Sequence, residues 1–331
     1  MSKSLFAVGL LAALALAPAP AQAVEVKIAS LAPEGSAWAK ILQEGGKKIG
    51  ERTAGRVTVK FFFSGSQGDE RYVVRKMKLG QIDGSALTAV GLGLIKGDVR
   101  VLELPFLIKN NTELDYVRDK MAPDFEKQFL DAGYVLIAWG DVGWTHYYSN
   151  SEIKTKEDLT KVKMWAWTDD PIVRAFFKRM GINGVPLGVP DVLPALQTDT
   201  INACYGSPLA AVALQWYTKV KFATTQTITY SIGALIIRKE KFAEISPEDQ
   251  KIMKEEGAAL GQKLMSAVRR DNERAANAMK KSGITFVPTP PELSAELEKA
   301  GQGVWEDLAG GKLYSDELLA KVKKHLSDVR K

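Results

Sequence analysis

The sequence predicts an α/β protein built from two lobes. Short apolar segments typical of buried strands alternate with amphipathic helical segments from residue 24 to residue 140, and the alternation restarts at residue 162. Alternating strands and helices favour a mostly parallel sheet covered by helices, so the restart indicates a second sheet. The 331-residue chain is long enough for two such lobes.

The first lobe begins with a predicted strand at residues 24–31 and a helix that Ser36 can cap and that ends near Gly55. The helix at residues 114–133 is expected to be interrupted or to restart near Pro123. The other predicted elements of this lobe are a strand at 56–63, a helix at 72–81, a short buried strand at 82–88 and a strand at 134–140.

The second lobe begins with a strand at residues 162–167. Asp169 and Asp170 precede Pro171, which favours a helix start over a pair of catalytic carboxylates, and Gly181 ends that helix. The remaining predicted elements are strands at 185–189, 201–205 and 233–239 and helices at 191–199 and 208–219. No flexible linker separates the lobes, so the crossover segments are expected to act as a hinge.

A long helix is predicted from Ser246 to Ser282, with Ser246 as its cap and Pro247 at its first position. At about 1.5 Å per residue it would measure on the order of 55 Å, so it is expected to span both lobes. The alternative is two shorter helices broken near Gly261.

The first 23 residues are typical of a secretory signal peptide. Lys3 supplies a positive charge, residues 5–16 are almost entirely apolar, and residues 21–23 have the small-x-small pattern of a cleavage site. An uncleaved membrane anchor is the alternative, but the apolar run is shorter than the roughly 20 residues that span a bilayer. The protein is therefore expected outside the cytoplasm.

Charge and cysteine content exclude several classes of protein. The formal net charge of +6 is spread over the chain with no basic block and no interleaved aromatic residues, so no nucleic-acid partner is expected. Cys204 is the single cysteine, which excludes an internal disulfide. A buried, inert thiol is expected, with a reactive thiol as the alternative.

The parts of an enzyme are missing from the sequence. It contains no HExxH, CxxC, GxSxG or Walker-type pattern, and its two histidines are His146 and His325. His325 lies in a basic terminal segment, and His146 could either reach a ligand site or pack in the ordinary way. We therefore expect no catalytic residue, no cofactor and no metal.

A series of short motifs covers the rest of the chain in a characteristic order and spacing. They are Gly68–Arg71, Lys78–Asp83, Leu104–Leu107, Glu157–Lys163, Ala195–Thr198, Ser207–Leu209 and Ser246–Lys251. With them the chain resembles the solute-binding proteins of tripartite ATP-independent periplasmic (TRAP) transporters.

The resemblance implies a two-lobed periplasmic binding protein fold. Its lobes, joined by a hinge, would close on one small organic solute and deliver it to a membrane permease, with the protein a monomer in the periplasm. The first lobe would comprise residues 24–148 and 236–275, and the second lobe residues 149–235 and 276–331. The alternative partner is a sensor or another carrier.

The sequence departs from this family at the positions that bind carboxylates. The family's central arginine falls on Trp165, a second arginine falls on Thr145, and an asparagine falls on Ser207. The family's acidic residue is replaced around Tyr205 and Gly206. These changes weaken an assignment to the usual carboxylates and imply a more apolar solute, such as a bulky or aromatic organic acid.

Two tryptophans are the first candidates for the solute site. Strand periodicity places Trp165 and Trp167 on one face and Met164 and Ala166 on the other. Indole rings suit aliphatic, aromatic or cationic ligands, but packing in the core is the alternative for both tryptophans. The further candidates, each with an ordinary structural role as its alternative, are Leu31, Asp69, Thr88, Thr145, Val189, Tyr205 and Ser207.

Overall fold

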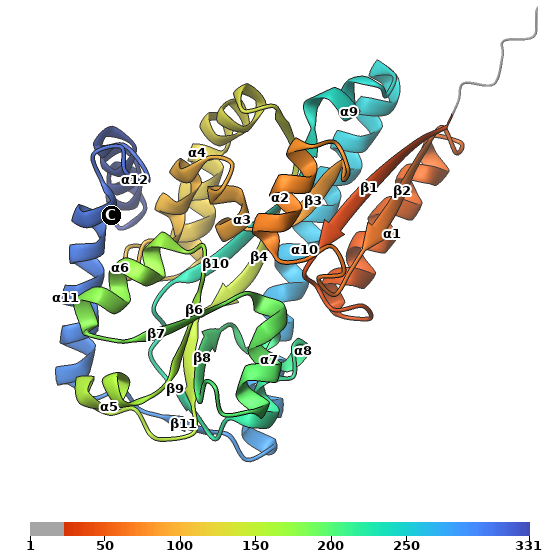
Figure 1. The fold of residues 1–331 in the computed structure, drawn as a ribbon. Coiled ribbons are helices and arrows are strands. Elements are labelled where there is room, and N and C mark those ends of the chain that lie inside the picture. Colours follow the sequence, from red (N-terminus) through yellow and green to blue (C-terminus); the bar gives the residue numbers. More distant parts are fainter. Residues whose placement is uncertain (1–22) are drawn as a thin grey trace, which may run out of the picture.

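Two β-sheets form the centres of two lobes in a computed structural model that describes residues 23–331 (Figure 1). The predicted signal peptide thus lies outside the described residues, apart from its last residue. The first sheet has the order β2-β1-β3-β10-β4 and the second the order β11-β9-β5-β8-β6-β7. The predicted two-lobed α/β fold is confirmed.

Most strands within each sheet are parallel, as the alternating pattern predicts. In the first sheet β1 is parallel to β2 and β3, and β10 is antiparallel to β3 and β4. In the second sheet β6 is parallel to β7 and β8, and β5 is antiparallel to β8 and β9. The strands of the first sheet are β1 Val24–Ser30, β2 Val57–Phe62, β3 Gly84–Thr88, β4 Tyr134–Trp144 and β10 Tyr230–Arg238. Those of the second are β5 His146–Ser149, β6 Met164–Trp167, β7 Gly184–Leu187, β8 Ala203–Gly206, β9 Phe222–Thr224 and β11 Thr285–Val287.

Helices cover both sheets. The helices up to the end of β4 are α1 Ala37–Arg52, α2 Glu70–Lys78, α3 Ala89–Gly93, the 3-10 helix η1 Gly97–Glu103 and α4 Asn111–Asp131. Those between β5 and β9 are α5 Lys156–Lys161, α6 Pro171–Met180, α7 Val189–Gln197, α8 Pro208–Ala213 and the 3-10 helix η2 Trp216–Lys219. The last are α9 Lys239–Ala243, α10 Pro247–Lys281, α11 Pro291–Leu308 and α12 Asp316–Val329.

Besides the stretch containing α10, which leads from β10 to β11, the chain crosses between the sheets at two neighbouring segments. β4 leads into β5 through Thr145, and residues 225–229 lead from β9 back to β10. The Thr145 amide donates to the Thr229 carbonyl at 2.9 Å, and the Ile228 amide donates to the Thr145 carbonyl at 3.0 Å. The two crossover segments are therefore paired at the position expected of a hinge.

The predicted lobe boundaries at residues 148/149 and 235/236 fall inside β5 and β10. The chain changes sheet before β5, between β9 and β10, and again between β10 and β11. The C-terminal helix α12 packs against α4 and η1 of the first lobe, and α11 packs against α6 of the second. The C-terminal pair of helices thus contacts both lobes.

The long helix α10 is continuous over 35 residues, about 50 Å, as the sequence predicts. It packs against α1 and β4 of the first lobe and against α8 of the second. The alternative of a break near Gly261 is wrong, and the two glycines have another role. A Cβ atom on Gly257 would lie 2.3 Å from the Ile137 carbonyl oxygen, and one on Gly261 would lie 2.8 Å from that of Trp139. The glycines let the helix approach the backbone of β4.

Helix α4 corrects one prediction. It runs without interruption through Pro123, where the sequence suggested a break. Met121 and Phe125 on either side of this proline are fully buried in the core. The free energy gained by burying these side chains offsets the cost of the backbone hydrogen bond that proline removes.

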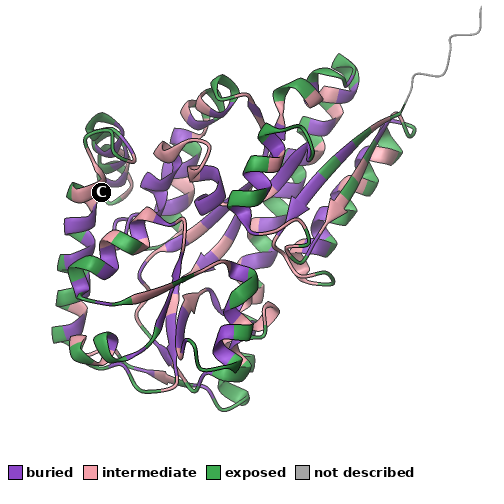
Figure 2. Cartoon of the chain, viewed as in Figure 1, coloured by how far each residue is buried: buried purple, intermediate pink, exposed green. Residues whose placement is uncertain are grey.

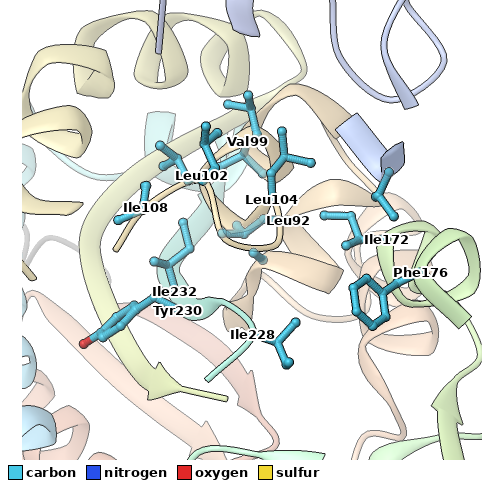
Figure 3. Close-up of a cluster of buried hydrophobic side chains, with 14 of the residues drawn as sticks. Leu92, Val99, Leu102, Leu104, Ile108, Ile172, Phe176, Ile228, Tyr230 and Ile232 are labelled. Atoms are coloured by element: carbon cyan, nitrogen blue, oxygen red, sulfur yellow. The ribbon is translucent and has the colours of Figure 1, made fainter. Parts of the chain in front are cut away.

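A shared apolar core joins the lobes beside the crossover segments. The buried strands and the exposed outer faces of the helices are distinguished in Figure 2. One cluster contains Leu92 and Leu104 from the first lobe together with Ile172 and Phe176 from α6, and Ile228 of a crossover belongs to it as well (Figure 3). The lobes thus meet through apolar contacts as well as through the hinge.

Candidate functional site

A cavity of about 220 Å³ lies between the lobes. Its walls come from both sheets and from both crossover segments, and most of its lining side chains are apolar. Pockets that enclose drug-sized ligands measure roughly 300–1,000 Å³, so this cavity suits a smaller solute. Of the nine candidate residues, the lining includes Leu31, Thr88, Thr145, Trp165, Trp167, Val189, Tyr205 and Ser207.

The side chains of β6 alternate as the sequence predicts. Met164 and Ala166 pack in the cluster that joins the lobes, whereas Trp165 and Trp167 belong to a separate cluster made mainly of second-lobe residues. The two tryptophans are therefore on the same face of the strand. That face borders the cavity, because both residues line it.

Trp165 lines the cavity from within an aromatic cluster. Its ring stacks on Tyr205 with 4.6 Å between centroids, and the ring of Trp216 meets it edge-on at 5.3 Å. Its Nε1 donates to the Leu187 carbonyl at 3.0 Å, and the residue is only 2% exposed. Trp165 is thus both part of the cavity wall and packed as a core residue. Its indole N–H already donates to a backbone carbonyl.

Asp69 lies outside the lining and instead joins the lobes. The Nε1 of Trp167 donates to Asp69 Oδ2 at 2.8 Å, and both residues are buried. Burial raises the pKa of the Asp69 carboxyl, while the hydrogen bond from Trp167 opposes this shift. Asp69 precedes α2 without capping it through its side chain. A contact across the lobes thus takes the place of the cap that the sequence offers as the alternative role of Asp69.

Arg100 of η1 is a buried cation in the lining that sequence reasoning missed. Its Nη2 donates to Asp170 Oδ1 of the second lobe at 2.9 Å and lies 3.2 Å from Glu103 Oε2. Its Nε and Nη1 are buried and have no hydrogen-bond partner among residues 23–331. Asp170 also accepts from the amides of Ile172 and Val173 at the start of α6, which confirms the predicted helix start.

Two buried glutamates of the lining were also missed. Glu70 accepts hydrogen bonds from the Thr88 amide at 2.7 Å, the Thr88 hydroxyl at 2.8 Å and the Gly91 amide at 2.6 Å. Burial nevertheless raises the pKa of Glu70 to about 8. Burial likewise raises the pKa of Glu103 to about 7, against the opposing effect of Arg100. Acids of this kind give no periodic signal in the sequence.

Two hydroxyl groups of the lining already have polar partners within the protein. Ser207 accepts from the Ala210 amide at 3.2 Å and so caps α8, as its structural alternative proposes. The Thr145 hydroxyl lies 3.5 Å from that of Ser231. Leu31 directly follows β1 and Val189 begins α7, and both add apolar surface to the wall.

His146 and Cys204 have structural surroundings. His146 Nδ1 lies 2.8 Å from the Thr224 carbonyl, its ring packs edge-on against Phe286, and it is outside the cavity lining. Cys204 is fully buried, as predicted, and burial raises the pKa of its thiol. Residues 23–331 contain no group of three or more His, Cys, Asp or Glu side chains arranged to hold a metal ion. In the same range no helix is both long and apolar enough to cross a membrane.

Two lobes, a paired hinge and a cavity between them define a binding protein that encloses a small solute. The chain belongs to the bacterial extracellular solute-binding proteins of family 7, the DctP family, whose model matches residues 28–311. The predicted resemblance is thereby confirmed, and the protein is a solute-binding protein rather than an enzyme.

Individual relatives agree with this family. The 2,3-diketo-L-gulonate-binding periplasmic protein YiaO of Escherichia coli is 25% identical over 240 residues, which cover 72% of this chain and 73% of YiaO. A TRAP periplasmic solute-binding protein of Ralstonia eutropha, solved with (S)-2-acetolactate, has a TM-score of 0.85 at 20% identity over 92% of this chain and 99% of its own. The sugar acid-binding protein DctPAm of Advenella mimigardefordensis, in complex with galactonate, has a TM-score of 0.87 at 17% identity over 94% and 100%.

Proposed function

We propose that this protein is the periplasmic solute-binding subunit of a TRAP transporter and that its solute is a small organic acid with a bulky, apolar or aromatic body. The observation that carries the proposal is the cavity between the lobes, with its wall of Trp165, Trp167 and Tyr205. The relatives described above are named for or solved with organic acids. An apolar wall favours an acid whose body is less polar than a sugar acid.

The proposal extends to the localisation and the partner of the protein. The signal peptide at residues 1–23 directs the chain to the periplasm, where it acts as a monomer. The two lobes close on the solute, and the closed protein delivers it to the membrane permease. In this proposal binding and release are the whole activity, with no cofactor or metal.

Identification of the natural solute tests this function. The full chain would be expressed with its signal peptide and purified from the periplasm, and any co-purified molecule would be released by denaturation and identified by mass spectrometry. A thermal-shift screen of organic acids and neutral aromatic compounds would be run in parallel. An organic acid should be recovered or should raise the melting temperature. Binding of neutral compounds alone would contradict the proposed class of solute.

A transport measurement tests the partner. Deletion of the gene from its host should abolish uptake of the identified acid, and deletion of the genes for its TRAP permease should have the same effect. Normal uptake in the strain without this protein would contradict a role in transport.

A further inference from the structure

Among residues 23–331, Arg100 is the single positively charged residue that lines the cavity. It is 2% exposed, and its position is fixed by Asp170 and Glu103, which both lie on Nη2. The terminal Nη1 and the inner Nε remain without a partner. A protein that buries a guanidinium usually pairs all of its donors, because an unpaired buried donor has lost its hydrogen bonds to water without replacement.

A bound solute can supply the missing acceptor. We infer that the carboxylate of the solute accepts hydrogen bonds from Nη1 of Arg100, while Nη2 stays on Asp170 and Glu103. This inference rests on the proposed function, which makes the solute an organic acid. Arg100 would then serve in place of the family's arginines, which fall on Thr145 and Trp165. It would contact the solute from the first lobe, whereas Trp165 belongs to the second. A guanidinium suits this role because it stays charged when buried and has donors on several sides.

The charges around Arg100 are compatible with a third carboxylate. Glu103 faces Arg100, accepts from the Ile232 amide at 2.8 Å and lies near the Ser231 hydroxyl and Asp170. Burial raises its pKa to about 7, so Glu103 holds a proton in mildly acidic solution. Arg100 is then shared between Asp170 and the solute. Above this pKa an ionised Glu103 would repel the solute, so acid binding should weaken as the pH rises.

The same contact also links the solute to closure of the lobes. Arg100 belongs to the first lobe and Asp170 to the second, so an acid held on Nη1 would touch a residue that already bridges the cleft. A carboxylate would therefore favour the arrangement in which the lobes are in contact.

The test compares acids with their uncharged amides. Isothermal titration calorimetry would measure phenylacetate against phenylacetamide, and the acid found with the protein against its own amide, on wild type, Arg100→Gln and Asp170→Asn. Wild type should prefer each acid by about 10- to 100-fold, the range expected of a hydrogen bond to a charged group. Arg100→Gln should lose this preference. Asp170→Asn should weaken acid and amide together but keep the preference, because loss of the charge weakens the contact between the lobes, while the side-chain oxygen of the introduced asparagine and Glu103 can still hold Nη2 and so keep Nη1 in place.

The outcomes separate this inference from the proposed function. If Arg100→Gln keeps the full preference for the acid, the inference is overturned while the organic-acid function stands. If wild type binds none of the acids, the proposed class of solute fails and the inference fails with it. Circular dichroism would establish that each variant folds, and Arg100→Lys would replace Arg100→Gln if that variant does not fold. A lysine carries its donors on a single nitrogen, so it cannot contact Asp170 and the solute from two separate nitrogens as a guanidinium can. The preference of Arg100→Lys for the acid over the amide should therefore fall at least several-fold.

Discussion

Trp167 of the second lobe donates from Nε1 to the carboxylate of Asp69 in the first lobe at 2.8 Å. Two further residues of the same turn also reach the first lobe, because Asp170 pairs with Arg100 at 2.9 Å and Asp169 lies 3.8 Å from Arg71. The turn between β6 and α6 therefore supplies several polar contacts across the cleft. These contacts form only while the lobes lie together, so their strength should set how readily the protein closes.

Trp167→Phe should weaken solute binding by about 1.5–3 kcal/mol. The variant keeps the aromatic body but removes the donor to Asp69, which then stays buried without a side-chain partner when the lobes are in contact. In an open form Asp69 would be hydrated, so the loss applies to the closed form. Calorimetry with the identified solute would give the change in affinity, and small-angle X-ray scattering would report the fraction of closed protein.

Trp144→Phe is the matched control for this variant. The Nε1 of Trp144 donates to Asn111 Oδ1 at 3.1 Å, and both residues belong to the first lobe. Loss of that hydrogen bond should lower stability slightly without changing closure. Equal loss of affinity in the two variants would show that the contact between Trp167 and Asp69 has no special part in closure.

Trp165→Ala should lower both stability and solute affinity. Removal of an indole packed against Tyr205 and Trp216 should lower the free energy of unfolding by about 3–5 kcal/mol, and loss of its surface from the cavity wall should weaken binding by about 1–3 kcal/mol. Thermal denaturation and calorimetry would measure the two effects separately, at a temperature where the variant is folded.

Phe125→Ala provides the comparison. Phe125 is fully buried in α4 and is outside the cavity lining, so its loss should lower stability by a similar amount and leave affinity unchanged. An unchanged affinity in Trp165→Ala would make this tryptophan a core residue alone and would remove the main reason to expect an apolar solute.

The parts of the fold that the sequence predicts are those that local pattern determines. Alternation along β6 places Trp165 and Trp167 together, Asp170 before Pro171 starts a helix, and uninterrupted helical sequence makes α10 continuous. Each of these depends on residues that are neighbours in the chain. Strand β5 was missed because it follows β4 after the single residue Thr145, so no turn signal separates them.

The charged part of the site could not be predicted in the same way. Arg100 is buried because it meets Asp170, a residue 70 positions away in the chain. Glu70 is buried because the start of α3 offers it the donors of Thr88 and Gly91. A sequence alone cannot show that a charged side chain will contact partners so far away in the chain. Arg100 and Glu70 therefore have the sequence pattern of ordinary surface charges. The apolar wall was predicted, whereas the buried ion pair was not.

Gly257→Ala should destabilise the protein although alanine is the better helix former. The added Cβ would lie 2.3 Å from the Ile137 carbonyl oxygen, so α10 would have to move away from β4. Overpacking of this kind costs about 1–3 kcal/mol, more than the roughly 1 kcal/mol gained in helix propensity. Urea denaturation would measure the change in the free energy of unfolding.

Gly50→Ala in α1 is the matched control, because the nearest atom to its added Cβ would be the Val57 carbonyl oxygen at an ordinary 3.8 Å. This variant should be stabilised by about 0.5–1 kcal/mol. If Gly257→Ala were stabilised to the same extent, close approach of α10 to β4 would not explain the glycine.

The stability of the protein should fall as the pH rises from about 5 to about 8. Burial raises the pKa of Glu70 from 4.5 to about 8, so the folded protein holds a proton that the unfolded chain releases above pH 4.5. Stabilisation from this proton is complete below pH 4.5 and is lost as the pH approaches 8, by about 1.4 kcal/mol per pH unit. Glu103, with a pKa raised to about 7, should add to the slope up to that pH.

Glu70→Gln isolates the contribution of this residue. Urea denaturation at several pH values should give a slope that is shallower than that of wild type by about one proton between pH 5 and pH 8. Glu298→Gln, which alters an exposed side chain of α11, should keep the wild-type slope. If Glu70→Gln also kept the full slope, the three hydrogen bonds from Thr88 and Gly91 would be strong enough to hold Glu70 ionised despite its burial.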